Sequence, residues 1–140
     1  MNAKRYLLAA AGVFVVYSVL AYVIHQIILG SDYAAIQSTL RSVEQFTRRL
    51  PVLYAGNLIF ALAFCFIYAK GYEPGRSWLG QGTRFGLILG TLLAPVALTE
   101  YVVYPVPEML AVKWVVFGYL QLVVSGLVAA GLYQPRPRPA

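Results

Sequence analysis

The chain has 140 residues, of which 60% are apolar and only 11% are charged. A soluble domain carries about 25% charged residues, and a chain this short could not bury so much apolar surface, so the composition excludes a free-standing soluble enzyme. The same composition excludes a disordered protein, because disordered chains are rich in charged residues and poor in aromatic ones. The net charge of +6 is typical of membrane-protein loops beside anionic headgroups, and we expect no nucleic-acid partner.

Four apolar stretches are long enough to cross a membrane. The first, residues 7–29, has no charged residue and as a helix would reach roughly 34 Å, enough for a hydrocarbon core of about 30 Å. It is too long for the apolar part of a signal peptide, so we interpret it as an uncleaved first span. The others are residues 52–69, 85–103 and 109–132. The sequence therefore predicts an all-α fold, a four-helix transmembrane bundle that forms one domain over residues 1–133.

The segment between the first two spans, residues 30–51, is too long for a simple turn. Tyr33, Ile36, Leu40 and Val43 recur at helical spacing. This spacing predicts a short amphipathic helix lying on the membrane surface, and a small lid packed over the bundle is an equally good interpretation.

The distribution of Lys and Arg orients the chain. With the N-terminus inside, the inner segments hold more basic residues than the outer ones, and the positive-inside rule then places both termini in the cytoplasm. We expect a plasma membrane or a bacterial inner membrane. Residues 134–140 form a tail rich in Pro and Arg, which we expect beside the headgroups. The inner basic residues are Lys4, Arg5, Lys70, Arg76, Arg84, Arg136 and Arg138, and the outer ones are Arg41, Arg48, Arg49 and Lys113.

Polar residues from different spans lie at one depth, roughly 6–9 Å below the outer boundary by helical rise. They predict a polar pocket in the outer half of the bundle, because such side chains are costly in hydrocarbon. Lys113 has the same depth but points away from the small and polar face of its helix, so we expect it to reach toward the headgroups. The predicted pocket is lined by His25, Asn57, Glu100, Tyr101 and Tyr104.

Two interpretations of His25 and Glu100 stay open. The pair could relay a proton or bind a ligand, because a buried carboxylate beside an imidazole can titrate near neutrality. It could equally be a hydrogen bond that holds two helices together. We expect no metal and no cofactor, because the chain has a single histidine and its single cysteine, Cys65, lies among apolar residues.

Gly82, Gly86 and Gly90 repeat at intervals of four residues. Small residues at this spacing let membrane helices approach closely. We therefore expect these three glycines to pack against another helix, and we expect the third span to be central.

The layout of the spans resembles small bacterial four-helix integral membrane proteins of unknown function. The resemblance rests on Tyr68-Ala69-Lys70-Gly71, which leads through a glycine-rich loop to Arg84-Phe85-Gly86, and on the end of the fourth span from Gly126 to Tyr133. It implies a fold but brings no activity, substrate or catalytic residue.

The leading functional hypothesis is a non-enzymatic membrane subunit that packs with copies of itself or within a larger membrane complex. The alternative is a binder or carrier of a small amphipathic molecule, a quinone or a lipid, in the outer pocket. An intramembrane enzyme is not expected, because the sequence offers no metal cluster, no nucleophile with its base and no paired carboxylates.

Overall fold

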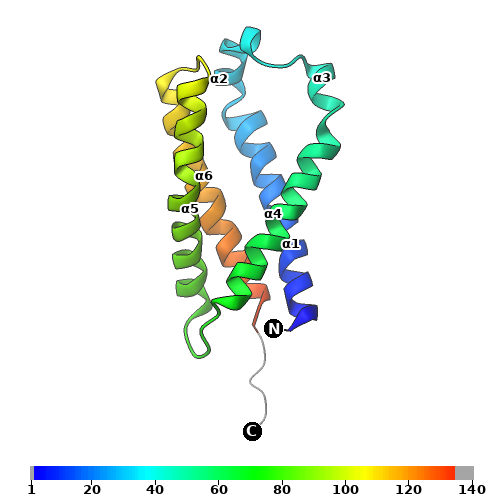
Figure 1. Ribbon diagram of the computed structural model, residues 1–140, viewed down its shortest axis with the longest axis vertical. Helices are drawn as coiled ribbons and strands as arrows, with labels where there is room; N and C mark the ends of the chain where they lie inside the picture. Colours follow the sequence, from blue (N-terminus) through cyan, green and yellow to red (C-terminus); the bar gives the residue numbers. More distant parts are fainter. Residues whose placement is uncertain (1, 135–140) are drawn as a thin grey trace.

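The computed structural model describes residues 2–134, and over this range its regular structure is entirely helical (Figure 1). Four helical spans are long and apolar enough to cross a membrane, which confirms the four predicted apolar helices. They are α1 (Ala3–Tyr22) continued by the π-helix η1 (Val23–Ile28), α4 (Leu50–Lys70), α5 (Trp78–Val103) and α6 (Glu108–Leu132). Three short elements, α2 (Gly30–Ala35), η2 (Gln37–Thr39) and α3 (Val43–Thr47), join η1 to α4. The predicted tail lies, beyond Gln134, outside the described residues.

The four long helices run between two ends of the molecule (Figure 1). We call one end the base; it holds the start of α1, the loop of residues 71–77 and the end of α6. We call the other end the crown; it holds residues 29–49 and the loop of residues 104–107 between α5 and α6. Asn2 caps α1 at the base by accepting a hydrogen bond from the Arg5 backbone N–H, and Pro51 lies in the first turn of α4 at the crown.

The helices lie in the order α4, α1, α6, α5, and the largest interface joins α5 to α6. The expectation that the third span is central is therefore wrong: α5 lies at one edge of the row, and α1 and α6 occupy its middle. The reason is that the glycine repeat gives α5 one closely packed neighbour rather than several.

The glycines of α5 lie against α6 at very short range. A Cβ atom added to Gly86 would lie 2.4 Å from the Cα of Val123, and one added to Gly82 would lie 2.7 Å from the carbonyl oxygen of Gly126. At Gly90 the nearest atom is Cδ1 of Tyr119, at 2.5 Å. The two helices approach so closely because these positions carry no side chain.

Aromatic side chains close the bundle at the base. Phe85 of α5 packs against Phe64 and Tyr68 of α4, with ring centroids 4.7 and 5.4 Å away. Toward the crown α4 diverges from the other helices (Figure 1), and residues 51–56 of α4 are all exposed. Residues 98–103 of α5 are exposed as well. The crown halves of these two helices therefore present apolar side chains outward.

The segment between η1 and α4 is not the single amphipathic helix that its spacing predicts. The backbone is extended at Leu40 and Ser42, and the Ser42 hydroxyl caps α3 by accepting a hydrogen bond from the Gln45 N–H at 3.3 Å. Serine favours a cap over a helix interior, so a second helix begins there. Ile36 is buried together with Leu110 of α6, whereas Val43 is 74% exposed. The first half of the segment thus packs as a lid over the ends of η1 and α6.

Candidate functional site

A chain of hydrogen bonds joins three elements at the crown. The Tyr33 hydroxyl of α2 lies 2.7 Å from Nδ1 of His25 in η1, and Nε1–H of Trp114 in α6 donates to the same oxygen at 2.7 Å. Because the indole N–H can only donate, the Tyr33 oxygen accepts that bond. The Tyr33 hydroxyl can donate to Nδ1 of His25 in one imidazole tautomer or accept a second hydrogen bond from Nδ1–H in the other, so both tautomers satisfy this contact.

The surroundings of Tyr33 make its hydroxyl a weaker acid than usual. Burial raises the pKa of Tyr33, the hydrogen bond from Trp114 acts in the opposite direction, and the negative charges of Glu100 and Asp32 raise the pKa further. The hydroxyl thus remains a neutral donor and acceptor at the centre of this chain.

An ion pair lies beside Tyr33. Nζ of Lys113 is 2.8 and 2.9 Å from the two carboxylate oxygens of Asp32, and both side chains are partly buried. The sequence did not indicate this partner, because α2 brings the carboxylate within reach of Lys113 only in the folded chain. The pair holds α2 against α6.

A cavity of about 540 Å³ opens between the lid segment and the α5–α6 loop. Two residues of opposite charge, Arg41 and Glu100, line it, and Trp114 connects it to the hydrogen-bond chain. Besides these three, the walls include Leu40, Gln45 and Tyr104.

The structure brings only some of the residues of the predicted polar pocket to these features. Glu100 and Tyr104 line the cavity, and His25 belongs to the adjacent hydrogen-bond chain. Asn57 donates a hydrogen bond to Ser18 at 3.1 Å and so joins α4 to α1, away from the cavity. Tyr101 lies on α5 outside the cavity lining, with its side chain 38% exposed. Within residues 2–134 no hydrogen bond joins His25 to Glu100, so a functional pairing of the two stays a prediction.

Two residues at the centre of the site were missed from the sequence. The helical spacing predicts Tyr33 on an apolar face, and this prediction offers its hydroxyl no partner. Trp114 shares a helical face with Gln121 and Ser125, and Gln121 donates across the bundle to the Tyr17 carbonyl at 2.9 Å. That polar stripe was the signal that the face of Trp114 points inward.

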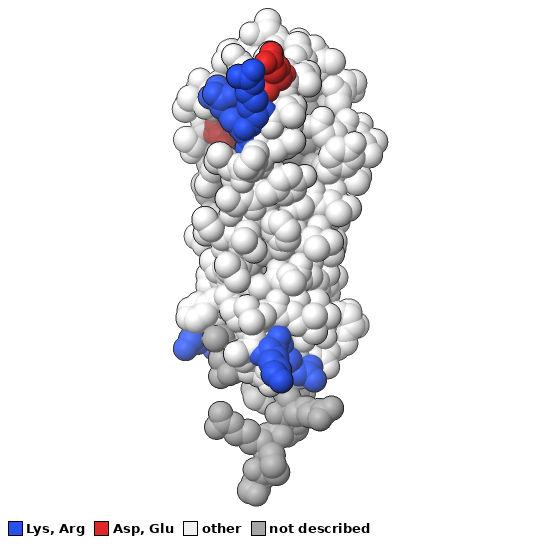
Figure 2. All heavy atoms as spheres, turned by 90° about the vertical axis from the view of Figure 1, so that its right-hand side faces the viewer, with Lys and Arg blue, Asp and Glu red and all other residues white. Residues whose placement is uncertain are grey.

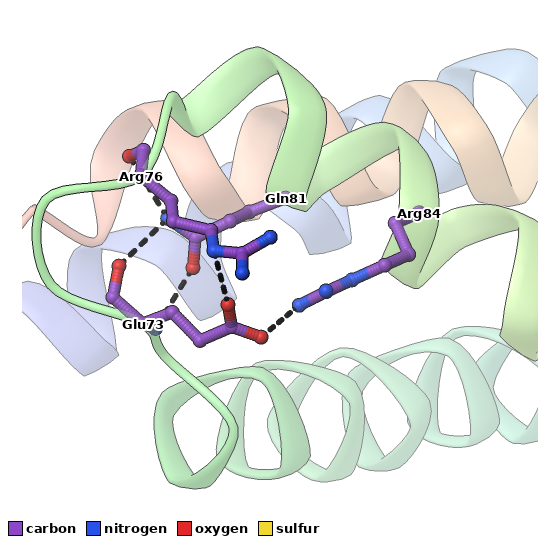
Figure 3. A network of polar contacts seen from close by, with 4 residues as sticks. All are labelled: Glu73, Arg76, Gln81 and Arg84. Atoms are coloured by element: carbon purple, nitrogen blue, oxygen red, sulfur yellow. Dashed lines mark hydrogen bonds and ion pairs between the residues drawn. The ribbon is translucent and has the colours of Figure 1, made fainter.

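A second polar network closes the loop at the base (Figure 3). The Glu73 carboxylate lies between Arg76, whose Nε is 2.8 Å away, and Arg84, which donates to it from α5. The Gln81 amide donates to the Glu73 and Arg76 carbonyls at 3.0 and 3.1 Å. These bonds explain why α5 begins at Trp78, well before residue 85: the first turns of the helix hold the loop in place.

The hydrogen bond from Arg84 holds the pKa of Glu73 below its usual range, and the positive charges of Arg84 and Arg76 act in the same direction.

In the described part of the chain, no three His, Cys, Asp or Glu side chains gather to hold a metal ion. Comparisons with protein-family models, curated proteins and solved structures found no match to this chain. The roles of its residues therefore rest on its own geometry.

Proposed function

We propose that this chain is a non-enzymatic integral membrane protein whose four long helices cross a plasma or bacterial inner membrane. In this proposal it serves as a subunit of a membrane assembly, made of copies of itself or of a larger complex. The observation that carries the proposal is an outward face of α4 that has small residues and no partner among residues 2–134.

This face of α4 is formed by Val52, Gly56, Ile59 and Ala63, which share one side of the helix by their spacing. Val52 is 72% exposed and Ile59 is 68% exposed. A Cβ atom added to Gly56 would meet no other atom within 4 Å. In lipid, helices associate through close packing rather than through the hydrophobic effect, and exposed small residues favour such packing. The face is therefore suited to a helix from another subunit.

The arrangement of charges supports an orientation with the base in the cytoplasm. Figure 2 shows an uncharged middle, with basic residues at the base and both signs together at the crown. The described residues near the base include five basic side chains and only one acidic side chain, Glu73. Toward the crown four basic residues are matched by four acidic ones. An excess of Lys and Arg at one end favours the cytoplasmic side. The basic residues at the base are Lys4, Arg5, Lys70, Arg76 and Arg84.

The test measures the particle mass of the protein after it is transferred from its own membrane into lipid nanodiscs. It compares two glycine substitutions with the wild type. Gly56→Leu fills the outward face of α4. Gly80→Leu makes the same change at an exposed position of α5 that also has open space around it. We expect the wild type and Gly80→Leu to have a particle mass above that of one 15.4 kDa chain in its disc, and Gly56→Leu to fall to the mass of one chain.

A wild-type particle that holds one chain and no other protein would contradict the assembly. An assembled mass that survives in Gly56→Leu would show that α4 is not the face through which the subunits pack.

A further inference from the structure

The crown cavity holds two opposite charges that do not neutralise each other. Arg41 and Glu100 both line it and both are exposed, yet no ion pair joins them to any described residue. Neighbouring charges behave differently: Asp32 binds Lys113, and Glu44 binds Arg48 at 2.6 Å. A cavity that keeps one positive and one negative group available suits a ligand that itself carries both charges.

The rest of the lining favours an organic cation beside Glu100. Two aromatic residues, Trp114 and Tyr104, line the cavity together with Glu100, and Nε1–H of Trp114 already donates to Tyr33. A ring face attracts an ammonium group, and the effect adds to that of a carboxylate. The positive group of the ligand therefore belongs beside Glu100, and its negative group belongs beside Arg41.

An apolar strip continues from the cavity along α5. Val96 and Leu93 lie one and two helical turns below Glu100 on the same face. Val96 is 54% exposed and Leu93 is 37% exposed. A ligand whose charged part occupies the cavity would lay a hydrocarbon chain along this strip. The cavity volume of about 540 Å³ lies within the range of about 300–1,000 Å³ that is usual for small-molecule sites.

We propose that the crown cavity binds the headgroup of a zwitterionic phospholipid, with the phosphate at Arg41, the ammonium at Glu100 and an acyl chain along Val96 and Leu93. A quinone would leave both charges unused, and an anionic phospholipid without an amine would leave Glu100 unpaired. This inference rests on the proposed membrane location but not on the proposed assembly. Lipid binding and subunit packing involve different helix faces, so each can fail alone.

The test measures lipid retention by single chains in a nonionic detergent, using native mass spectrometry. The added probes share the same acyl chains: phosphatidylethanolamine, phosphatidylglycerol, and a diacyl lipid with only a trimethylammonium headgroup. We expect the wild type to retain phosphatidylethanolamine about two- to fivefold better than either of the others, which is the size expected for one exposed charge contact.

Two variants each remove one charge from the cavity. Glu100→Gln should abolish the preference over phosphatidylglycerol, and Arg41→Gln should abolish the preference over the cationic lipid. Glu108→Gln and Arg49→Gln are the matched controls, because these residues lie toward the crown but do not line the cavity. Both controls should keep the wild-type preference. Because the readout is a ratio between lipids, a change in overall stability does not alter it.

The proposal is overturned if the wild type does not distinguish the three lipids, or if both cavity variants keep its preference. Free phosphoethanolamine, which has both charges but no acyl chain, should not displace the bound lipid. Displacement at matched concentration would show that the cavity takes a soluble zwitterion rather than a lipid.

Discussion

Tyr33 joins three helical elements through one oxygen atom, because it accepts a hydrogen bond from Trp114 and contacts His25, each at 2.7 Å. Two partly buried nitrogen atoms therefore depend on one hydroxyl. A polar group that loses its partner away from water costs more than the net value of an ordinary hydrogen bond. The crown should be sensitive to this single atom.

Replacing Tyr33 by Phe keeps the ring but leaves Trp114 Nε1–H and His25 Nδ1 without their partner. We expect Tyr33→Phe to lower the free energy of unfolding in detergent by about 1–3 kcal/mol and to change the fluorescence of Trp114. Tyr54→Phe is the control, since Tyr54 is exposed and its hydroxyl makes no hydrogen bond to the described residues. Equal unfolding curves for the two variants would show that the hydrogen-bond chain contributes nothing.

Glu73, in the loop at the base of the molecule, makes the stability of the fold depend on pH in a direction that its lowered pKa determines. Its pKa is lower in the folded chain than in the unfolded chain, so the carboxylate stabilises the folded state above the unfolded pKa, and this contribution disappears as the pH falls through the folded pKa. We expect the wild type to melt at a higher temperature than Glu73→Gln at neutral pH, and the difference to vanish in acid. A difference that stays constant across the titration would contradict the role of Arg84 and Arg76.

At this scale the sequence identified polar residues that lie near one another in the structure, and the functional pairing of His25 with Glu100 stays a prediction. It selected His25 and Glu100 and placed both near one end, and the structure has them at the crown. The angular spacing of an ideal α-helix does not apply around His25. His25 lies in a π-helix, where the Leu29 N–H donates to the Ile24 carbonyl five residues earlier, and this wider turn changes the direction of each following side chain. In the structure the partner of His25 Nδ1 is the hydroxyl of Tyr33.

At the scale of elements, the contact between α5 and α6 follows from positions without side chains. The repeat of Gly82, Gly86 and Gly90 predicted close packing, and the structure places all three against α6. The sequence did not indicate which helix would be the partner. A periodic stripe of glycines shows which face of a helix lets another helix approach closely. It does not identify that other helix, because the residues that fit the stripe lie in a different span, at Val123 and Gly126.

The same substitution at two glycines of α5 tests this contact. We expect Gly86→Ala to lower the free energy of unfolding by about 1–3 kcal/mol, because its Cβ would lie 2.4 Å from a backbone atom, Cα of Val123, and overpacking has this cost. Gly80→Ala has open space around it and should gain up to about 1 kcal/mol from helix propensity. Thermal unfolding in detergent measures both. Equal stabilities would mean that α5 and α6 do not pack through this seam in solution.

The segment over the crown shows where helical periodicity is insufficient. Tyr33, Ile36, Leu40 and Val43 have the spacing of one helical face. A periodic pattern does not reveal a break, however, and Ser42 begins a new helix just beyond Leu40. A capping serine inside a predicted helix was the signal against a single element.

At the scale of the whole molecule, an uncharged middle separates two ends of different charge (Figure 2). Basic residues predominate at the base, whereas basic and acidic residues are equal in number toward the crown. All four long helices run the length between these ends (Figure 1). Composition and hydropathy predicted this arrangement because the lengths of the apolar stretches depend only on local sequence. The divergence of α4 from the other helices toward the crown could not be predicted, because it depends on which helices pack against one another.

The most direct test of the account is the side of the membrane on which each end lies. Single cysteines are introduced at Ser38 in the crown and at Ser77 in the base, both exposed, in a chain with Cys65→Ser. A membrane-impermeant maleimide is then applied to sealed right-side-out vesicles. We expect labelling of Ser38→Cys alone, with Ser77→Cys labelled only after the vesicles are opened. Labelling of both cysteines from the same side would contradict a protein whose four helices cross the membrane.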